Sequence, residues 1–106
     1  MAINYGMLGQ TADASSEVTL YTAPALKNVK ARVTIANRST AATFNVAVVP
    51  DGGVTANEDY ISYEAPLDAN ETLTSTTLTL NESDVIRAQS STANVTFIIF
   101  GIEQDL

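Results

Sequence analysis

The chain contains no cysteine, histidine or tryptophan among its 106 residues. Without cysteine, neither disulfide bonds nor thiolate metal ligands hold the fold together, so packing must be sufficient. Without histidine and cysteine, a Ser-His-Asp triad, a Cys-His dyad and a zinc site built from these residues are excluded. The glycine-rich phosphate loops GxxxxGK[ST] and GxGxxG are also missing. These absences exclude most familiar hydrolases and leave phosphate binding of these kinds without support.

Acidic pairs are the remaining catalytic option. Glu58 with Asp59, or Glu82 with Asp84, would supply the two carboxylates that glycoside hydrolysis needs. Each pair lies beside Asn, Ser or Gly in an expected loop, where acidic side chains normally cap turns. We therefore expect no enzymatic activity.

Two loops are rich in oxygen ligands of the kind that calcium prefers. One carries Asp51, Asn57, Glu58 and Asp59, and the next carries Asp68, Asn70 and Glu71. Neither follows the EF-hand spacing. Turn formation is the favoured role for both loops, and we expect no metal site and no cofactor.

Aromatic platforms for sugars are scarce, because tryptophan is missing and only four tyrosines are present. Tyr60 and Tyr63 differ in parity within one expected strand, so they should face opposite ways, with one of them in the core. A sugar-binding role for the pair is the weaker interpretation, because strand tyrosines are commonly packing groups.

Positive charge is also scarce, since the net charge is −7 and the sequence pI is about 4.1. Such a chain is repelled by nucleic acid and by anionic membranes, so neither is an expected partner. The charge is uneven, however: residues 27–50 carry +4, and residues 51–106 carry −9. This asymmetry would suit copies that pack head to tail, although a solvated surface of uneven composition would look the same.

Long hydrophobic runs are absent, and the first eight residues contain no base. The sequence therefore predicts neither a secretory signal nor a membrane span, and we expect synthesis in a cytoplasm. Its length fits one domain over residues 1–106.

Short β-branched and aromatic runs, separated by turn residues, predict an all-β protein. The expected strands cover residues 2–9, 17–22, 29–35, 43–49, 59–63, 71–80, 84–90 and 94–103. Seven or eight such strands are typical of a single antiparallel β-sandwich, either jelly-roll or Ig-like.

Three local features refine this expectation. The run 43–49 should pair with 29–35 as a hairpin, because their connection is short. Pro66 should close the strand that begins at residue 59. The run 71–80 changes phase between Leu73 and Leu78, which predicts a bulge or bend near residues 76–77.

The last strand-like run is apolar on both faces, which an ordinary half-solvated strand is not. Val95, Phe97 and Ile99 face one way, and the alternate residues Ile98, Phe100 and Ile102 face the other. We expect Phe97 in the core, and Phe100 and Ile102 largely buried against the N-terminal segment or another protein molecule. This favours a role in assembly.

The N-terminal residues 1–10 are either an arm that adds to a neighbour or an edge strand that pairs with the last strand of the same chain. Lys30 and Arg32 share the polar face of the strand 29–35. The candidate interface residues are Ile3, Tyr5, Met7, Leu8, Lys30, Arg32, Ile98, Phe100 and Ile102.

The order of strand edges and turns is similar to one class of proteins along nearly the whole chain. The segments are LGQ at 8–10, LYTAP at 20–24, IANR at 35–38, TFNVAV at 43–48, YI at 60–61, ANET at 69–72, LNESDVI at 80–86 and the closing run 97–103. They resemble small β-sandwich virion proteins of tailed bacteriophages. The resemblance transfers no site residues.

That resemblance implies a structural, non-catalytic role in the virion, after synthesis in the host cytoplasm. The implied partners are the major capsid protein or other virion proteins, and copies of the chain itself as a homo-oligomer. A capsid decoration (cement) protein that stabilises the head is the first interpretation, and a tail or fibre module is the second. A sugar- or calcium-binding β-sandwich module is the alternative from a different class.

Overall fold

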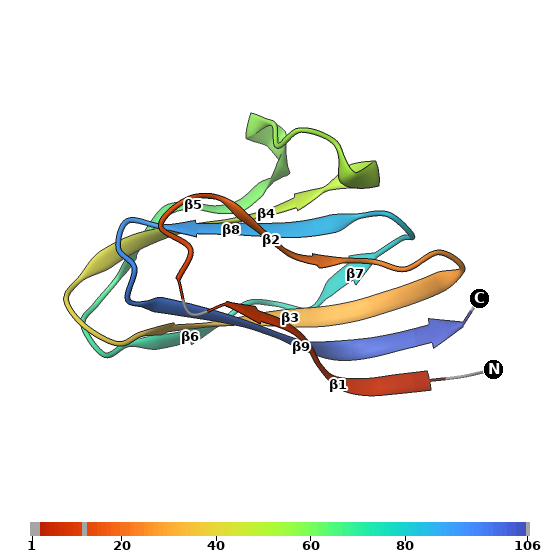
Figure 1. Ribbon diagram of the computed structural model, residues 1–106, viewed down its shortest axis with the longest axis horizontal. Helices are drawn as coiled ribbons and strands as arrows, with labels where there is room; N and C mark the ends of the chain where they lie inside the picture. Colours follow the sequence, from red (N-terminus) through yellow and green to blue (C-terminus); the bar gives the residue numbers. More distant parts are fainter. Residues whose placement is uncertain (1–2, 12, 106) are drawn as a thin grey trace.

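The computed structural model describes residues 3–11 and 13–105, which form two antiparallel sheets packed face to face (Figure 1). Sheet A has the order β1-β9-β3, with β6 and β7 both paired to the far side of β3. Sheet B has the order β2-β8-β4-β5. This arrangement confirms the expected all-β sandwich.

The strands are separated by short turns, and two 3-10 turns follow β4. The elements are β1 (Ile3–Thr11), β2 (Val18–Thr22), β3 (Lys27–Asn37), β4 (Ala42–Val49), η1 (Pro50–Gly52), η2 (Asn57–Asp59), β5 (Tyr60–Leu67), β6 (Thr72–Thr74), β7 (Leu78–Leu80), β8 (Val85–Ser90) and β9 (Val95–Asp105). Within the described residues, no helix has the length and apolar character needed to cross a membrane.

Strands that follow one another in the chain mostly lie in opposite sheets, which is the jelly-roll pattern and not the Ig-like one. The expected hairpin between the third and fourth strands is therefore wrong. β3 pairs with β9 in sheet A, and β4 pairs with β8 and β5 in sheet B. The short connection between them turns over the end of the sandwich, because both strands bury one face in the shared core.

The core lies between the sheets and is built from the alternate residues of each strand. In β3 the buried residues are Val29, Ala31, Val33 and Ile35, on the face opposite the expected polar face of Lys30 and Arg32. Phe97 of β9 is fully buried and meets Phe44 of β4 edge to face, with 6.5 Å between the ring centroids. Such alternation places one apolar face of each sheet against the other.

The phase change in residues 71–80 divides the run into two strands that both pair with β3. Ile35 lies opposite Leu73 of β6, whereas Ala31 lies opposite Leu78 of β7. The two registers differ by one residue, which the break at residues 75–77 absorbs. The predicted bend is confirmed, and it keeps both leucines on the core side.

Pro66 does not close its strand, contrary to expectation, because β5 continues to Leu67. Within the described residues, β5 is an edge strand of sheet B and pairs with β4 alone. A proline at an edge removes no ladder hydrogen bond on its open side, so the strand continues through it.

A buried tyrosine joins the two sheets near the C-terminal end of β9. The hydroxyl of Tyr21, in β2 of sheet B, donates a hydrogen bond to Oε2 of Glu103, in β9 of sheet A. Burial of Tyr21, then this hydrogen bond and the charge of Glu103, raise the pKa of Tyr21 above its ordinary value. Tyr21 therefore keeps its proton in the folded protein at pH values where an unfolded chain releases it.

We expect Tyr21 to make the protein sensitive to alkali. An acid whose pKa is raised by folding contributes stability below its unfolded pKa, about 10 for tyrosine, and loses it as the pH rises further. Between about pH 8 and 11, the melting temperature of the wild type should fall more steeply than that of Tyr21→Phe. Both proteins share the other tyrosines, so equal slopes would contradict this role of Tyr21.

Candidate functional site

The outer face of sheet A, the side turned away from sheet B, brings together candidate interface residues from three strands. Across β9 and β3, Phe100 lies opposite Arg32, and Ile102 lies opposite Lys30. On the other side of β9, Met7 of β1 lies opposite Phe100. Directly paired residues share a face of a sheet, so these five side chains form one surface. We use "outer face of sheet A" for Met7, Lys30, Arg32, Ile98, Phe100 and Ile102.

Three apolar residues on this surface are open to solvent in the single chain, and the fourth, Ile98, is half-buried. Met7 is 54% exposed, Phe100 is 47% exposed and Ile102 is 36% exposed. The expectation that Phe100 and Ile102 are largely buried is wrong for the isolated chain, whereas Phe97 is buried as predicted. The reason is that β1 pairs with β9 edge to edge (Figure 1), which extends the sheet and leaves its outer face uncovered.

Two cations stand beside these apolar residues. Lys30 and Arg32 are exposed, and the Nε of Arg32 donates to Oγ1 of Thr77 over 3.1 Å. A groove of about 380 Å³ runs between them, Phe100 and Ile102. In the part of the chain that the structure describes, Lys27 forms a salt bridge with Asp105, whereas Lys30 and Arg32 form no salt bridge. Their charge is therefore available to a partner.

One predicted interface residue lies on the other side of the sheet. Leu8 is the extra residue of a bulge between Met7 and Gly9, and it packs against the core. Neighbouring residues in a strand point to opposite faces, which separates Leu8 from Met7. The side chains of Ile3 and Tyr5 lie outside what the structure describes.

Sequence reasoning missed the contribution of the short strand β7 and its flank to this surface. Thr77 lines the groove and holds Arg32, although it is far from Arg32 in the chain. Gly6 and Gly101, which are paired across β1 and β9, also line the groove. No sequence signal identifies these residues, because their placement depends on the register between strands.

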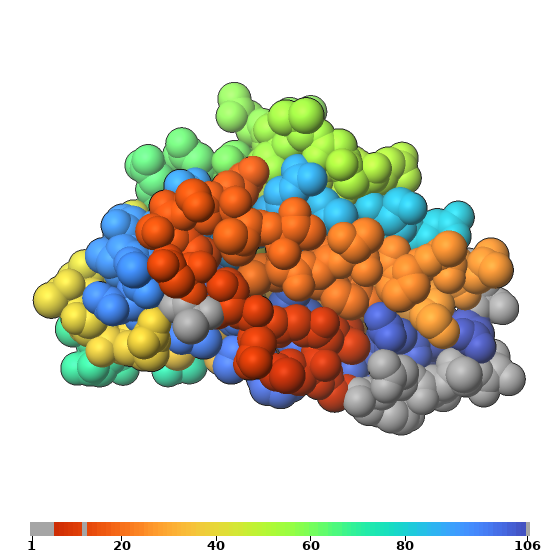
Figure 2. All heavy atoms as spheres, viewed as in Figure 1, coloured from red at the N-terminus to blue at the C-terminus, as the bar shows by residue number. Residues whose placement is uncertain are grey.

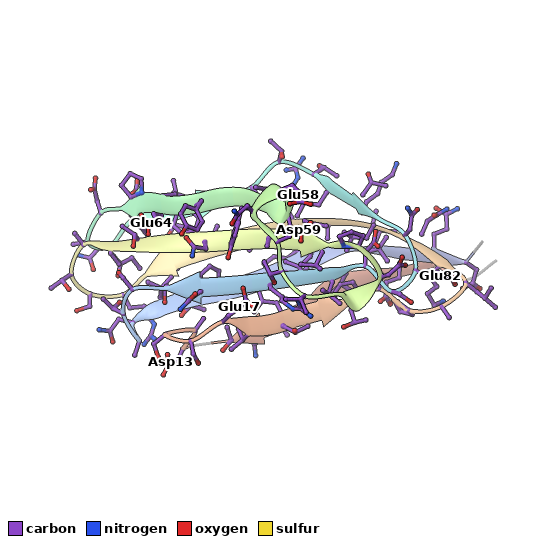
Figure 3. All side chains as sticks on the ribbon, turned by 90° about the horizontal axis from the view of Figure 1, so that it is seen from above. Asp13, Glu17, Glu58, Asp59, Glu64 and Glu82 are labelled. Atoms are coloured by element: carbon purple, nitrogen blue, oxygen red, sulfur yellow. The ribbon has the colours of Figure 1, made fainter. Side chains whose placement is uncertain are left out.

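Acidic side chains gather instead on sheet B and its loops. Figure 3 looks onto this side and labels six of them: Asp13, Glu17, Glu58, Asp59, Glu64 and Glu82. The segment 50–59, green in Figure 2, projects above sheet B on the same side. The molecule therefore has an apolar and basic face on one sheet and an acidic side on the other.

The loop acids hold the backbone of their own turns, as the sequence predicts. Asp59 accepts a hydrogen bond from the backbone nitrogen of Ala56 over 2.8 Å, and Glu71 accepts one from Asp68 over 2.8 Å. Both carboxylate oxygens of Asp84 accept backbone hydrogen bonds, one from Asp51 and one from Asn81. Among the described residues, no group of three or more acidic side chains is placed to hold a metal ion.

The two tyrosines of β5 do not face opposite ways, which corrects the expectation from their parity. Their rings meet edge to face with 4.8 Å between centroids. Tyr60 lies opposite Ala47 and Ser62 lies opposite Val46, so β5 contains an extra residue between them. That bulge shifts the alternation, and it brings Tyr63 onto the same outer side of sheet B as Tyr60. Tyr63 is 61% exposed, and neither ring belongs to the main core.

Two solved structures share this fold at low sequence identity. One is a chain of the Bacillus endospore appendages, which are described as a family of disulfide-linked pili. It matches with a TM-score of 0.61 and 12% identity, over 99% of this chain and 88% of that chain. The other is from the acidic stable capsid of Helicobacter pylori bacteriophage KHP30, with a TM-score of 0.57 and 16% identity, over 98% of this chain and 88% of that chain.

No protein-family model and no curated protein matches the sequence of this chain. At these identities, the two structural matches establish the β-sandwich fold. A shared fold does not by itself carry a shared function, which must be argued from the surface of this chain.

Proposed function

We propose that this chain is a non-enzymatic structural protein of a bacteriophage virion, which decorates the head by binding the assembled major capsid protein. The outer face of sheet A carries the proposal. It presents exposed apolar side chains beside cations that make no salt bridge within the described chain. Exposed apolar patches rimmed by polar groups are typical of protein interaction sites. The fold likeness to a phage capsid chain supports the same role.

The likeness to disulfide-linked pili points to a second kind of assembly, but its linkage cannot be used here. The 106 residues contain no cysteine, so they form no disulfide with a neighbouring copy. Contacts between copies through these residues would therefore form without disulfides. A tail or fibre module of the virion remains the second candidate, because the likeness to a pilus chain shows that this fold is also found in a filament.

The charge distribution suggests how copies could contact each other. The basic outer face of sheet A of one copy would meet the acidic sheet B side of the next, which gives attraction in a head-to-tail contact. A closed ring of such contacts would make a defined oligomer, and an open series would make a fibre.

Sedimentation of the purified protein, together with binding to assembled capsids, distinguishes these roles. A decoration protein should stay a monomer or small oligomer and sediment with capsids without any added ligand. A fibre module should form open polymers by itself. A protein that neither polymerises nor binds capsids or tails would contradict the virion proposal.

We expect the double variant Lys30→Glu with Arg32→Glu to fold normally and to assemble poorly. Each surface charge interaction contributes about 0–1 kcal/mol, so the loss of affinity for capsid or for other copies should be roughly 3- to 30-fold. The effect should grow at low salt, where repulsion is least screened.

The matched control is Lys30→Gln with Arg32→Gln, which removes the charges without reversing them and should weaken assembly less. Thermal melting confirms that both variants are folded. If the folded Glu variant assembles as well as the wild type at low salt, these two cations are ordinary solvated surface.

A further inference from the structure

Tyr63 stands on the outer side of sheet B between two hollows. One hollow, of about 500 Å³, lies against Tyr60 and Asn57. The other, of about 280 Å³, is lined by polar groups that include Asn45 and Gln89. A tyrosine that only packs in a fold contributes by burying its ring. An exposed ring with a hollow on each side is therefore unusual for that role.

The ring is held in place, so the hollows are preformed. Tyr60 packs edge to face against Tyr63, and Tyr60 itself rests on the small cluster of Ala47, Val49 and Val85. Next to Tyr63, Glu64 has a positive φ of 48°. Its backbone nitrogen donates to Oδ1 of Asn45 over 2.6 Å, which fixes a second irregularity of β5, between Ser62 and Ala65, to the neighbouring strand. Preformed geometry lowers the entropy lost when a ligand binds.

Donors and acceptors converge on the smaller hollow. The Oδ1 of Asn45 is engaged by Glu64, so its amide nitrogen is the part that remains for a ligand. Among the described residues, the hydrogen bond of the Gln89 side chain uses its amide nitrogen, in a long 3.5 Å contact with the carbonyl of Ser15, so its oxygen can accept. Ser91 accepts from the backbone nitrogen of Thr43 over 3.0 Å and can still donate its hydroxyl proton.

We propose that Tyr63, with Asn45, Gln89 and Ser91, forms a binding site for a neutral oligosaccharide. A pyranose ring has an apolar C–H face, which packs on an aromatic ring, and hydroxyl groups at its edge, which pair with amide donors and acceptors. The hollow offers both kinds of contact side by side. A few polar groups that fix orientation beside an aromatic surface are typical of small-ligand sites.

The surrounding charge selects the class of sugar. Glu64 lines the smaller hollow. Glu58 and Asp59 directly follow Asn57 in the sequence, and Asn57 lines the larger hollow. Figure 3 shows all three acids on the side of the molecule that carries Tyr63's strand. Anionic glycans are repelled by these carboxylates, so the site fits uncharged hexose or N-acetylhexosamine units.

Titration of the folded chain with defined sugars tests the site by amide chemical shifts. The neutral probes are maltohexaose, cellohexaose, mannohexaose and chitohexaose, and the anionic probe is a hyaluronan hexamer. At least one neutral probe should bind with a dissociation constant below about 10 mM and change the amide chemical shifts of Glu64 and Gln89. Tyr63→Ala should weaken this binding about 10-fold or more, whereas Tyr63→Phe should stay within roughly 3-fold.

Gln89→Ala tests the polar contacts without touching the bulge, and it should also weaken binding. Met7→Ala, an exposed apolar truncation on sheet A, is the matched control and should bind like the wild type. The proposal is overturned if no neutral probe binds, if only hyaluronan binds, or if folded Tyr63→Ala binds as the wild type does. It is also overturned if Tyr63→Ala impairs assembly and leaves sugar binding intact.

Discussion

Replacing Phe97 with alanine should lower the free energy of unfolding by about 3–5 kcal/mol. Phe97 is fully buried between the sheets, where its ring meets Phe44. The substitution removes the apolar contacts of the ring and leaves a cavity, because the surrounding strands are held by their ladders and cannot close around it. Small domains have free energies of unfolding of only about 5–15 kcal/mol, so this substitution should remove a large part of the protein's stability.

Phe100→Ala on the same strand is the matched control for this change. Phe100 is 47% exposed, so its truncation should change the free energy of unfolding by less than about 1 kcal/mol. The two variants delete the same atoms on opposite faces of β9. Chemical denaturation of both proteins gives the comparison. An unchanged stability for Phe97→Ala, or an equal loss for both, would show that the faces of β9 are wrongly assigned.

Gly101→Ala should be a damaging change in sheet A despite its small size, with a loss of about 1–3 kcal/mol in the free energy of unfolding. A Cβ at this position would lie 2.2 Å from the carbonyl oxygen of Lys30 and 2.9 Å from the Cα of Ala31. Both neighbours are backbone, so no side chain can rotate away. β9 and β3 must separate locally, and they form the central ladder of the sheet, paired from Lys27 with Asp105 to Asn37 with Val95.

Gly53→Ala is the control for the glycine substitution. Its added Cβ would come no closer than 3.6 Å to another atom, the carbonyl oxygen of Pro50, which is ordinary contact. This variant should melt within a few degrees of the wild type. Thermal melting of both variants tests the pairing of β3 with β9, and equal melting temperatures would contradict the close approach at Gly101.

Much of the local structure could be predicted from alternation alone. The burial of Val29, Val33 and Ile35 and the position of Phe97 follow from a period of two residues, because a strand with one buried face leaves little freedom in its phase. The break within residues 71–80 was predictable for the same reason. The phase change between Leu73 and Leu78 needs one inserted residue to keep both on the core.

Partner strands were not predictable in this way. A short connection allows β4 either to return beside β3 or to cross to the other sheet, and both paths bury the same apolar face. The crossing was decided by β9, which occupies the place beside β3 that β4 would otherwise take. Tyr60 and Tyr63 show the same limit, since the bulge that aligns them exists only in the pairing of β5 with β4.

The sequence by itself determined the all-β sandwich class, the buried faces of the regularly alternating strands and the doubly apolar character of β9. These depend on the order of polar and apolar residues along each strand, which is a local property. Only the tertiary structure decided that β1 extends sheet A and leaves Phe100 and Ile102 open, and that Lys30 and Arg32 stand beside them. The register between distant strands places these groups together. It results from the packing of the whole sandwich, because no single segment carries enough information to select its own neighbours.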